Sequence, residues 1–304
     1  MAENPTEWPE GMGHDGRTRG RAGGPGGMNP SLAELEAASR VAETPNGAGR
    51  VVWHEWGAGK PLVMLHGGAG SWRHWARNIP FLSRHRRVLA PDTPGLGESD
   101  LPPPGTGIWD MAAILADGIA ARIGKGTRYD LVGFSFGSVI SGHIAARHAE
   151  GLDSVTLSGA GALGIRREVT PMQSIRDRVG EERTEAHRAN LASLMIADPA
   201  RIDALALEIQ SWNSDRARFR SRNILTTTSL REALEEVPAE LPVHVIYGER
   251  DAIAYPNLQA RADLFQQMRP GTDFRLIPGA GHWVAFEAAE RFNAALADIL
   301  GIRE

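Results

Sequence analysis

Short apolar runs recur along this chain, and longer stretches with helical periodicity separate them. The runs occupy residues 51–56, 61–65, 87–91, 129–133, 154–158, 243–248 and 274–277. Runs of this length are typical of strands that are buried on both faces. The intervening helices are expected at residues 72–82, 108–123, 136–148, 258–267 and 284–300. Strands that alternate with helices predict an α/β fold, in which helices cover both faces of a mostly parallel sheet.

One long interval, residues 161–236, interrupts this alternation because it contains no strand-like run. Its apolar residues recur at helical spacing, and we expect helices at residues 169–179, 182–196 and 201–219. We interpret the interval as a helical cap over the carboxyl ends of the strands, where open α/β sheets bind ligands. The plainer alternative is a decoration that only lengthens the domain. The core is then expected to comprise residues 31–160 and 237–304, after a disordered leader at residues 1–30.

The composition excludes several classes of function. The chain has 304 residues, of which 42% are hydrophobic, as expected for one globular domain with an insertion. Its formal net charge of -4 gives no general attraction to nucleic acid. No apolar run approaches the ~20 residues that cross a bilayer, so we expect no membrane association. The absence of cysteine excludes thiolate catalysis, and the glycine-rich start without an apolar core favours a cytoplasmic protein over a secreted one.

A serine between two glycines is the strongest candidate for chemistry. Residues 133–137 read Gly-Phe-Ser-Phe-Gly and join the predicted strand at 129–133 to the predicted helix at 136–148. A sharp connection from strand to helix crowds the backbone, so small residues are needed at positions 133 and 137. Ser135 would then project its hydroxyl above the end of the sheet, as a nucleophile does.

A serine hydroxyl needs a base that takes its proton, and the base needs a partner that fixes its tautomer. Among ten histidines, His282 stands out because it lies in a glycine-rich loop after the last predicted strand. Asp251 lies in the turn after the strand at 243–248 and is the expected partner. Glu249 is a weaker alternative because it lies too close to the strand end, and Asp263 because it falls within a helix. The order serine, aspartate, histidine is that of nucleophile-elbow enzymes.

Donors for a developing oxyanion are expected at two backbone positions. The first is the N–H of Phe136, directly after the serine. The second lies in the glycine-rich loop at 66–70, with Gly68 as the preferred donor and Ala69 or Gly70 as alternatives. Glycines let backbone amides approach a substrate closely. The loop lacks the lysine and hydroxyl of a P-loop, and the chain has no His-Glu-x-x-His motif, so we expect neither a cofactor nor a metal site.

These motifs make the chain similar to the α/β-hydrolase superfamily from about residue 51 to its end. The matching pieces are residues 66–70, 92–99, 133–137, 248–251 and 279–282. The resemblance implies an eight-stranded sheet whose second strand is antiparallel, with a helical cap between strands six and seven. It also implies that Asp92 and Ser99 shape a supporting turn and take no part in the chemistry.

Within the superfamily the chain resembles capped serine hydrolases related to meta-cleavage-product hydrolases, which split C–C bonds in vinylogous 1,5-diketone acids. That resemblance implies a cap arginine on the substrate carboxylate and a tryptophan above the site. The expected substrate contacts are Gly67, Ala69, Trp212, Arg216, Arg220 and Trp283. On a helix Arg216 and Arg220 would share one face. Arg218 and Arg222 would share another, so at most one pair could face the site, and a solvated face is the alternative for all four.

Three functions stay open. The one that we favour is a serine hydrolase that cleaves a carboxylic ester or similar acyl bond of a small, partly hydrophobic molecule through an acyl-enzyme. The second is a C–C hydrolase of a dienoic keto acid. The third is a ligand receptor that kept the fold without turnover, since fold alone does not determine function. Each implies a small-molecule partner, and the sequence is compatible with a homo-oligomer.

Overall fold

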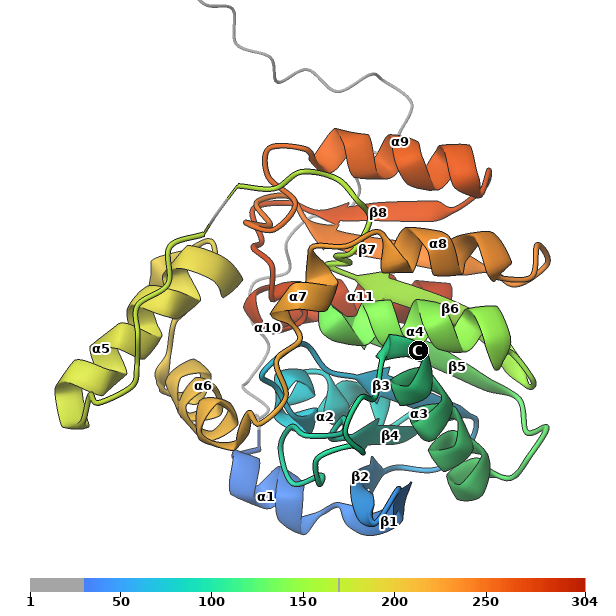
Figure 1. Ribbon diagram of the computed structural model, residues 1–304, viewed down its shortest axis with the longest axis horizontal. Helices are drawn as coiled ribbons and strands as arrows, with labels where there is room; N and C mark the ends of the chain where they lie inside the picture. The colour runs from blue at the N-terminus through green and yellow to red at the C-terminus, as the bar shows by residue number, and fades with distance from the viewer. Residues whose placement is uncertain (1–29, 169, 304) are drawn as a thin grey trace, which may run out of the picture.

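A mixed sheet of eight strands forms the centre of the protein, in a computed structural model that describes residues 30–168 and 170–303 (Figure 1). The predicted leader therefore lies outside the described residues, apart from residue 30. The strands are β1 (Arg40–Asn46), β2 (Gly49–Trp56), β3 (Pro61–Leu65), β4 (Arg87–Pro91), β5 (Tyr129–Phe134), β6 (Leu152–Ser158), β7 (Val243–Gly248) and β8 (Asp273–Ile277). Their order is β1-β2-β4-β3-β5-β6-β7-β8. Strand β2 runs antiparallel to both neighbours and β3 to β8 run parallel, which confirms the expected topology.

The central predicted strands form because their apolar runs are enclosed on both faces, whereas β8, at one edge of the sheet, is mostly half-buried. Every residue of β3 and of β5 is buried. Strand β1 was not predicted, because it lies at the edge of the sheet and carries few apolar residues. Most of its residues are exposed or half-buried, and it contains Pro45, which an edge strand tolerates. Its register against β2 is a long-range property that the local pattern does not reveal.

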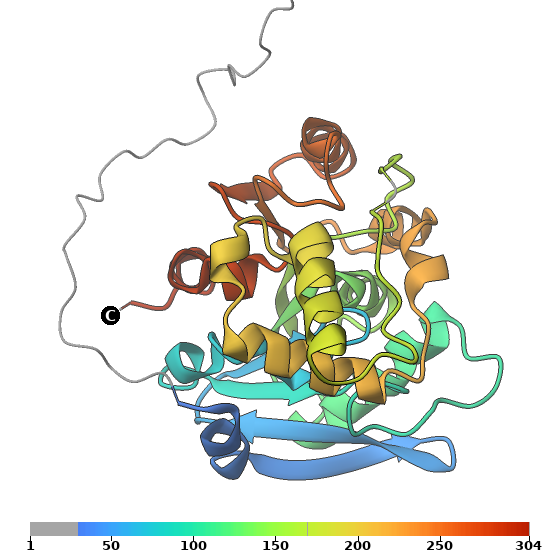
Figure 2. The same ribbon diagram turned by 90° about the vertical axis from the view of Figure 1, so that its left-hand side faces the viewer.

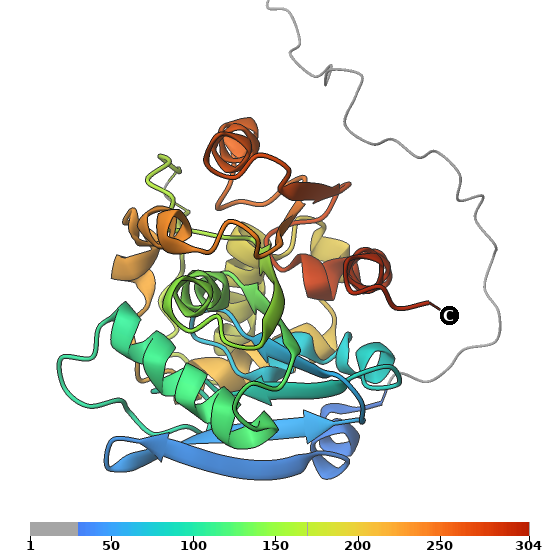
Figure 3. The ribbon, with the colours of Figure 1, turned by 90° about the vertical axis from the view of Figure 1, so that its right-hand side faces the viewer.

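Helices cover both faces of the sheet, as Figure 3 shows in end view. One face packs against α3 (Ile108–Ile123), α4 (Phe136–Arg147), α8 (Ser229–Glu236) and α9 (Leu258–Met268). The other face packs against α1 (Leu32–Ala37), η1 (Trp72–Trp75), α2 (Ile79–Leu82), α10 (Val284–Glu287) and α11 (Ala289–Ile299). Each face has its own hydrophobic cluster, so the sheet is the middle of three layers. Within the described ranges, no helix is both long and apolar enough to span a membrane.

The predicted supporting turn follows β4. The Asp92 carboxylate accepts the backbone N–H groups of Trp72 at 2.7 Å and Glu98 at 2.9 Å. The Ser99 hydroxyl accepts the N–H of Val52 at 2.8 Å and donates to the Asp92 carbonyl. These bonds hold the turn to the sheet, which agrees with a structural role for both residues.

The interval 161–236 has no strand among its described residues, as expected. Its elements are α5 (Gly180–Asn190), the π-helical turn η2 (Leu191–Met195), the 3-10 turn η3 (Pro199–Arg201), α6 (Ala204–Arg216), α7 (Arg222–Leu225) and α8. Figure 2 shows α5 and α6 in front of the sheet. Parts of this segment and the loops after β3, β5 and β8 line one cavity, so the segment lies over the carboxyl ends of the strands. Helix α8 instead packs on the face of the sheet beside α4.

Of the helices predicted in this interval, one does not form and another is shorter than predicted. Residues 170–179 form no helix, because Pro171 disfavours helix at the residue before it and Asn190 bonds both backbone groups of Gln173. The helix predicted at 201–219 is α6, which begins after Asp203, whose side chain caps it, and ends at Arg216.

Candidate active site

Ser135 occupies the sharp turn between β5 and α4. Its backbone has φ 53° and ψ -110°, a conformation that non-glycine residues rarely adopt. A Cβ at Gly133 would lie 2.3 Å from the carbonyl oxygen of Gly137. A Cβ at Gly137 would lie 2.2 Å from the carbonyl oxygen of Leu65. Only glycine fits at both positions, and the turn leaves the serine side chain on the wall of the cavity.

The structure brings the side chains of Ser135, His282 and Asp251 into one hydrogen-bonded series. His282 Nε2 lies 3.0 Å from Ser135 Oγ, and His282 Nδ1 lies 2.9 Å from Asp251 Oδ2. A carboxylate only accepts, so Nδ1 carries the proton and Nε2 is free to accept the serine hydroxyl. The other carboxylate oxygen of Asp251 accepts the N–H of Ile253 at 2.8 Å, which fixes the orientation of the acid. All three side chains are nearly enclosed, at 6%, 2% and 1% exposure.

The loop after β3 presents free backbone donors beside the serine. Within residues 30–168 and 170–303, neither the N–H of Gly68 nor that of Phe136 has a hydrogen-bond partner. A Cβ on Gly68 would lie 3.8 Å from the Cβ of Phe136, so the two positions are neighbours. The loop turns back at Ala69, which has a positive φ of 48°. Two adjacent unpaired N–H groups can stabilise negative charge on an oxygen placed between them.

Two buried histidines hold the peptide groups of this loop. His66 Nε2 accepts the N–H of Thr93 at 2.9 Å, so Nδ1 carries the proton and donates to the Gly67 carbonyl at 2.8 Å. Because the peptide unit is planar and trans, this bond fixes the direction of the Gly68 N–H. The Gly67 N–H in turn donates to His74 Nδ1 at 3.3 Å. Burial lowers the pKa of His66 to about 4, although the bond to Gly67 raises it, and burial lowers the pKa of His74 well below its ordinary value.

A cavity of about 890 Å³ lies over Ser135 and His282. The core lines it with Gly67, Gly68, Ala69, His74, Phe134 and Ile253. The 161–236 segment adds apolar side chains, among them Leu194, Met195, Phe219 and Leu225. It also adds polar ones, which include Asn190, Gln210, Arg220 and Ser221. Apolar atoms form most of the wall, and polar or charged side chains, which also include Arg167 and Glu168, interrupt it, as in sites for small molecules.

The predicted substrate contacts separate into two groups. Gly67, Ala69 and Arg220 line the cavity, but Trp212, Arg216 and Trp283 are not among its lining residues. Trp212 instead lies between the guanidinium groups of Arg73 and Arg216, 3.5 Å and 4.0 Å from its ring centre. Trp283 is fully buried, and its Nε1 donates to the His74 carbonyl at 2.9 Å.

The predicted helical pairing of the arginines was wrong, because α6 ends at Arg216 and the chain then leaves the helix. Arg220 therefore reaches the cavity from a loop, without Arg216 beside it. Arg218 turns away from the cavity and donates to the carbonyls of Gly97 and Ser99 in the turn after β4.

Comparison with known proteins places the chain in a family. The family model described as the alpha/beta hydrolase fold matches residues 60–289. The chain belongs to the α/β-hydrolase family. A 2-hydroxymuconate semialdehyde hydrolase of Pseudomonas sp. (strain CF600) is 29% identical over 266 residues, which span 81% of this chain and 89% of that protein. A 2-hydroxy-6-oxo-2,4-heptadienoate hydrolase of Pseudomonas putida is 27% identical, over 83% of this chain and 92% of that one. The solved carboxylesterase of Bacillus subtilis shares the fold, with a TM-score of 0.71 at 18% identity, over 86% of this chain and 91% of that chain.

Sequence reasoning missed several residues that line the site of this α/β-hydrolase, among them His74 and Ser221. His74 was not singled out, although it lies only four residues after the glycine-rich loop at 66–70. Its role becomes visible only in the structure, where it accepts the Gly67 N–H. Ser221 lies in the segment between α6 and α7, and its Oγ would be 2.3 Å from a Cβ on Gly68. No local pattern marks a serine that packs on a loop so distant in sequence. Over the described ranges, no three acidic or histidine side chains gather closely enough to hold a metal ion.

Proposed function

We propose that this α/β-hydrolase is a serine hydrolase that cleaves a carboxylic ester, or a similar acyl bond, in a small and partly hydrophobic molecule. The observation that carries the proposal is the series of hydrogen bonds from Ser135 through His282 to Asp251. A serine becomes a nucleophile when an adjacent base takes its proton, and a base does so when a third group orients it. The three residues supply these three roles.

In the proposed reaction Ser135 Oγ attacks the substrate carbonyl while His282 Nε2 takes the serine proton. Asp251 stabilises the imidazolium that forms, because its carboxylate accepts the Nδ1–H. His282 then protonates the leaving alcohol, and an acyl group remains on the serine. Water, activated by the same histidine, releases the acid and restores the hydroxyl.

The N–H groups of Gly68 and Phe136 are proposed to bind the oxyanion of the tetrahedral intermediate. Their lack of other partners supports this role, since buried N–H groups are otherwise almost always paired. Removing one such donor typically costs about 100- to 1000-fold in kcat. His66 and His74 support the donors indirectly, because they hold the Gly67 peptide groups in place.

The cavity supports a substrate of modest size. Its volume of about 890 Å³ is in the range of sites that enclose small organic molecules. Apolar side chains such as Leu194, Met195 and Phe219 favour a hydrophobic acyl or alcohol part. The proposed role of the segment before α8 is that of a cap, which excludes bulk water from this space.

A second candidate function is C–C hydrolysis of a dienoic keto acid. Two observations favour it. Several relatives are named for such reactions, among them the 2-hydroxymuconate semialdehyde hydrolase. Arg220 also lines the cavity without an ion-pair partner in the described part of the chain, and a guanidinium there would suit a substrate carboxylate.

The test is labelling with a fluorophosphonate, followed by a substrate panel. Wild type is expected to label stoichiometrically, and Ser135→Ala is expected not to label; equal labelling of both would remove the serine mechanism. Turnover of nitrophenyl esters with no activity on a dienoic keto acid supports the ester hydrolase. Faster turnover of the keto acid, with a large loss in Arg220→Ala, would replace it by the C–C hydrolase. Binding of either compound without product would contradict both.

A further inference from the structure

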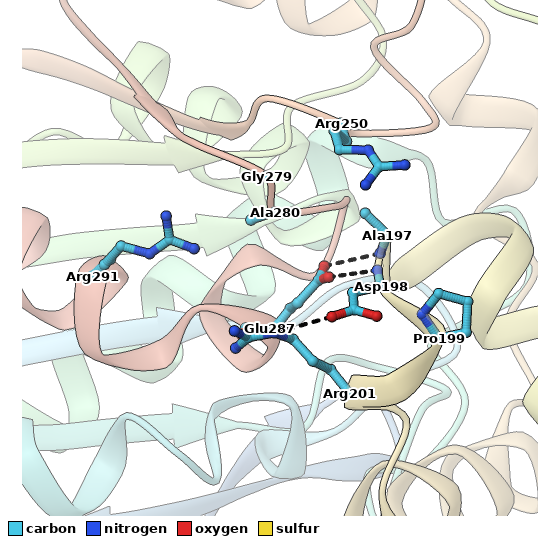
Figure 4. Close-up of a pocket in the computed structure, with 9 residues that line it drawn as sticks. All are labelled: Ala197, Asp198, Pro199, Arg201, Arg250, Gly279, Ala280, Glu287 and Arg291. Atoms are coloured by element: carbon cyan, nitrogen blue, oxygen red, sulfur yellow. Dashed lines mark hydrogen bonds and ion pairs between the residues drawn. The ribbon is translucent and has the colours of Figure 1, made fainter. Parts of the chain in front are cut away.

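Glu287 is a buried carboxylate that joins two segments far apart in the sequence (Figure 4). It ends α10 and is 3% exposed. Its Oε2 accepts the N–H of Gly281 at 2.6 Å and that of Ala197 at 3.0 Å, and its Oε1 accepts the N–H of Asp198 at 2.8 Å. Gly281 directly precedes His282 in the loop between β8 and α10, residues 278–283, which we call the histidine loop. Ala197 and Asp198 belong to the cap segment between η2 and η3. One side chain therefore binds the histidine loop and the cap together.

Other contacts bring the same two segments close. The N–H of Trp283, directly after the histidine, donates to the carbonyl of Met195 at 2.7 Å. A Cβ on Gly281 would lie 2.6 Å from the backbone nitrogen of Ala197 and 3.0 Å from the Met195 carbonyl oxygen. The backbones on both sides of His282 thus touch the cap segment at 195–198, so the position of the imidazole depends on where that segment lies.

Hydrogen-bond donors surround the buried carboxyl group of Glu287. A buried carboxylate is costly unless donors and positive charges compensate it. Three backbone N–H groups supply the donors. A surface hollow of about 360 Å³ lies beside it, and Arg201, Arg250 and Arg291 line this hollow (Figure 4). Arg201 also donates to the Glu287 carbonyl at 2.9 Å, which ties η3 to the end of α10.

The core holds the start of the histidine loop, where the Gly279 N–H donates to Glu249 and the Ala280 carbonyl accepts the Arg250 N–H, each at 2.8 Å. On either side of His282, however, this loop donates its backbone N–H groups to Glu287 and to Met195. It follows β8 and contains two glycines, and Gly279 adopts a positive φ of 69°. Catalysis needs His282 Nε2 within hydrogen-bonding reach of Ser135 Oγ, now 3.0 Å away. A displacement of about 1 Å can cost roughly 100-fold in rate. Loss of the bonds to Glu287 would release the backbone next to the base.

We propose that Glu287 is a positioning residue that couples the cap to the base. In this proposal, which rests on the function proposed above, His282 is held in reach of the serine only while the cap segment at 195–198 is seated on the histidine loop. The cap then controls catalytic competence as well as access.

The experiment measures the second-order rate of fluorophosphonate labelling on the full chain. In Glu287→Gln, an NH₂ group replaces one acceptor oxygen and opposes a backbone N–H. We expect labelling roughly 10- to 100-fold slower than in wild type. The matched control is Glu290→Gln, which removes an exposed carboxylate at the start of α11 and is expected to label within about twofold of wild type.

A second variant disrupts the contact from the cap side. Ala197→Pro removes the N–H that Oε2 accepts and places ring carbons against Gly281. Ile196 has ψ 118°, which a following proline accepts. This variant should also label slowly, although it lies far from the catalytic loop in sequence, and it carries the test if Glu287→Gln does not fold.

The outcomes separate this inference from the proposed function. If wild type does not label, or labels no faster than Ser135→Ala, both the proposed function and the coupling are overturned. Wild type that labels, with folded Glu287→Gln or Ala197→Pro labelling at the same rate, would overturn the coupling alone. If a variant melts at a lower temperature than wild type and still labels at the wild-type rate when assayed well below its melting temperature, the role of Glu287 is purely structural. This result would also overturn the coupling.

Discussion

Protonation of His66 should destabilise the folded protein at mildly acidic pH. The ring is fully buried, its Nδ1–H donates to Gly67 and its Nε2 accepts from the Thr93 N–H. A second proton must go on Nε2, where it would oppose the N–H of Thr93. Burial accordingly lowers the pKa of His66 to about 4, from an ordinary value of 6.5.

The sign follows from proton binding in the two states. Between pH 6.5 and about 4 the unfolded chain binds a proton at His66 and the folded chain does not. Stability therefore falls as the pH is lowered through this window. Below pH 4 the protonation of His66 lowers the free energy of unfolding by about 3 kcal/mol in full. About 2 kcal/mol of this loss occurs between about pH 7.5 and about pH 5.

The assay is urea unfolding of wild type and His66→Gln at these two pH values. Glutamine stays neutral, and its amide oxygen can accept the Thr93 N–H, so the variant should lose about 2 kcal/mol less than wild type on acidification. His85→Gln, which removes a half-buried histidine beside Phe81, is the control and should behave as wild type. An equal loss of stability in wild type and His66→Gln would refute the reasoning, because all other titrating groups are common to both.

Three further predictions concern the site and its supports. Asp251→Asn should lower kcat by roughly 1000- to 10,000-fold with KM little changed, because an amide cannot hold His282 in the required tautomer. Steady-state kinetics on the best ester substrate would measure this loss, and a decrease of about tenfold or less would count against the role of the acid. Gly137→Ala should abolish soluble folded protein, as its Cβ would meet the carbonyl oxygen of Leu65 at 2.2 Å, whereas a folded and active variant would contradict the model of the turn. Asn213→Ala breaks the buried 2.7 Å bond from the Ser71 hydroxyl to α6, so urea unfolding should show a loss of about 1–3 kcal/mol in the free energy of unfolding.

The core and the candidate site could be predicted because their signals are local. Strand β5 is a wholly buried run, and the glycines at 133 and 137 follow from the crowding that the turn imposes. Asp251 and His282 each lie in the loop that follows a strand end. In a parallel sheet those ends lie on one edge, so three distant residues could be placed together from the sequence alone.

The segment at 161–236 could not be predicted to the same depth, because long-range contacts decide where its helices begin and end. The stretch at 170–179 has helix-forming residues, yet the side chain of Asn190 binds its backbone in a non-helical form. Arg216 and Arg220 have helical spacing, yet the helix ends between them. Arg218 is drawn to the carbonyls of the turn after β4. The composition of such a segment predicts that it is helical, but its tertiary contacts decide where each helix ends and where each side chain points.

The segment that we propose as a cap is fixed to the core at the two loops on which the proposed chemistry depends. On the oxyanion side the Ser71 hydroxyl donates to Asn213 at 2.7 Å, and the guanidinium of Arg73 lies 3.5 Å from the Trp212 ring centre. On the histidine side the cap meets the Glu287 carboxylate. A segment held at both of these places cannot lift as one rigid lid without disturbing the catalytic geometry. Substrate is therefore expected to enter elsewhere, along the part of the cavity wall that Glu168, Thr170 and Met172 form, where Met172 is 37% exposed.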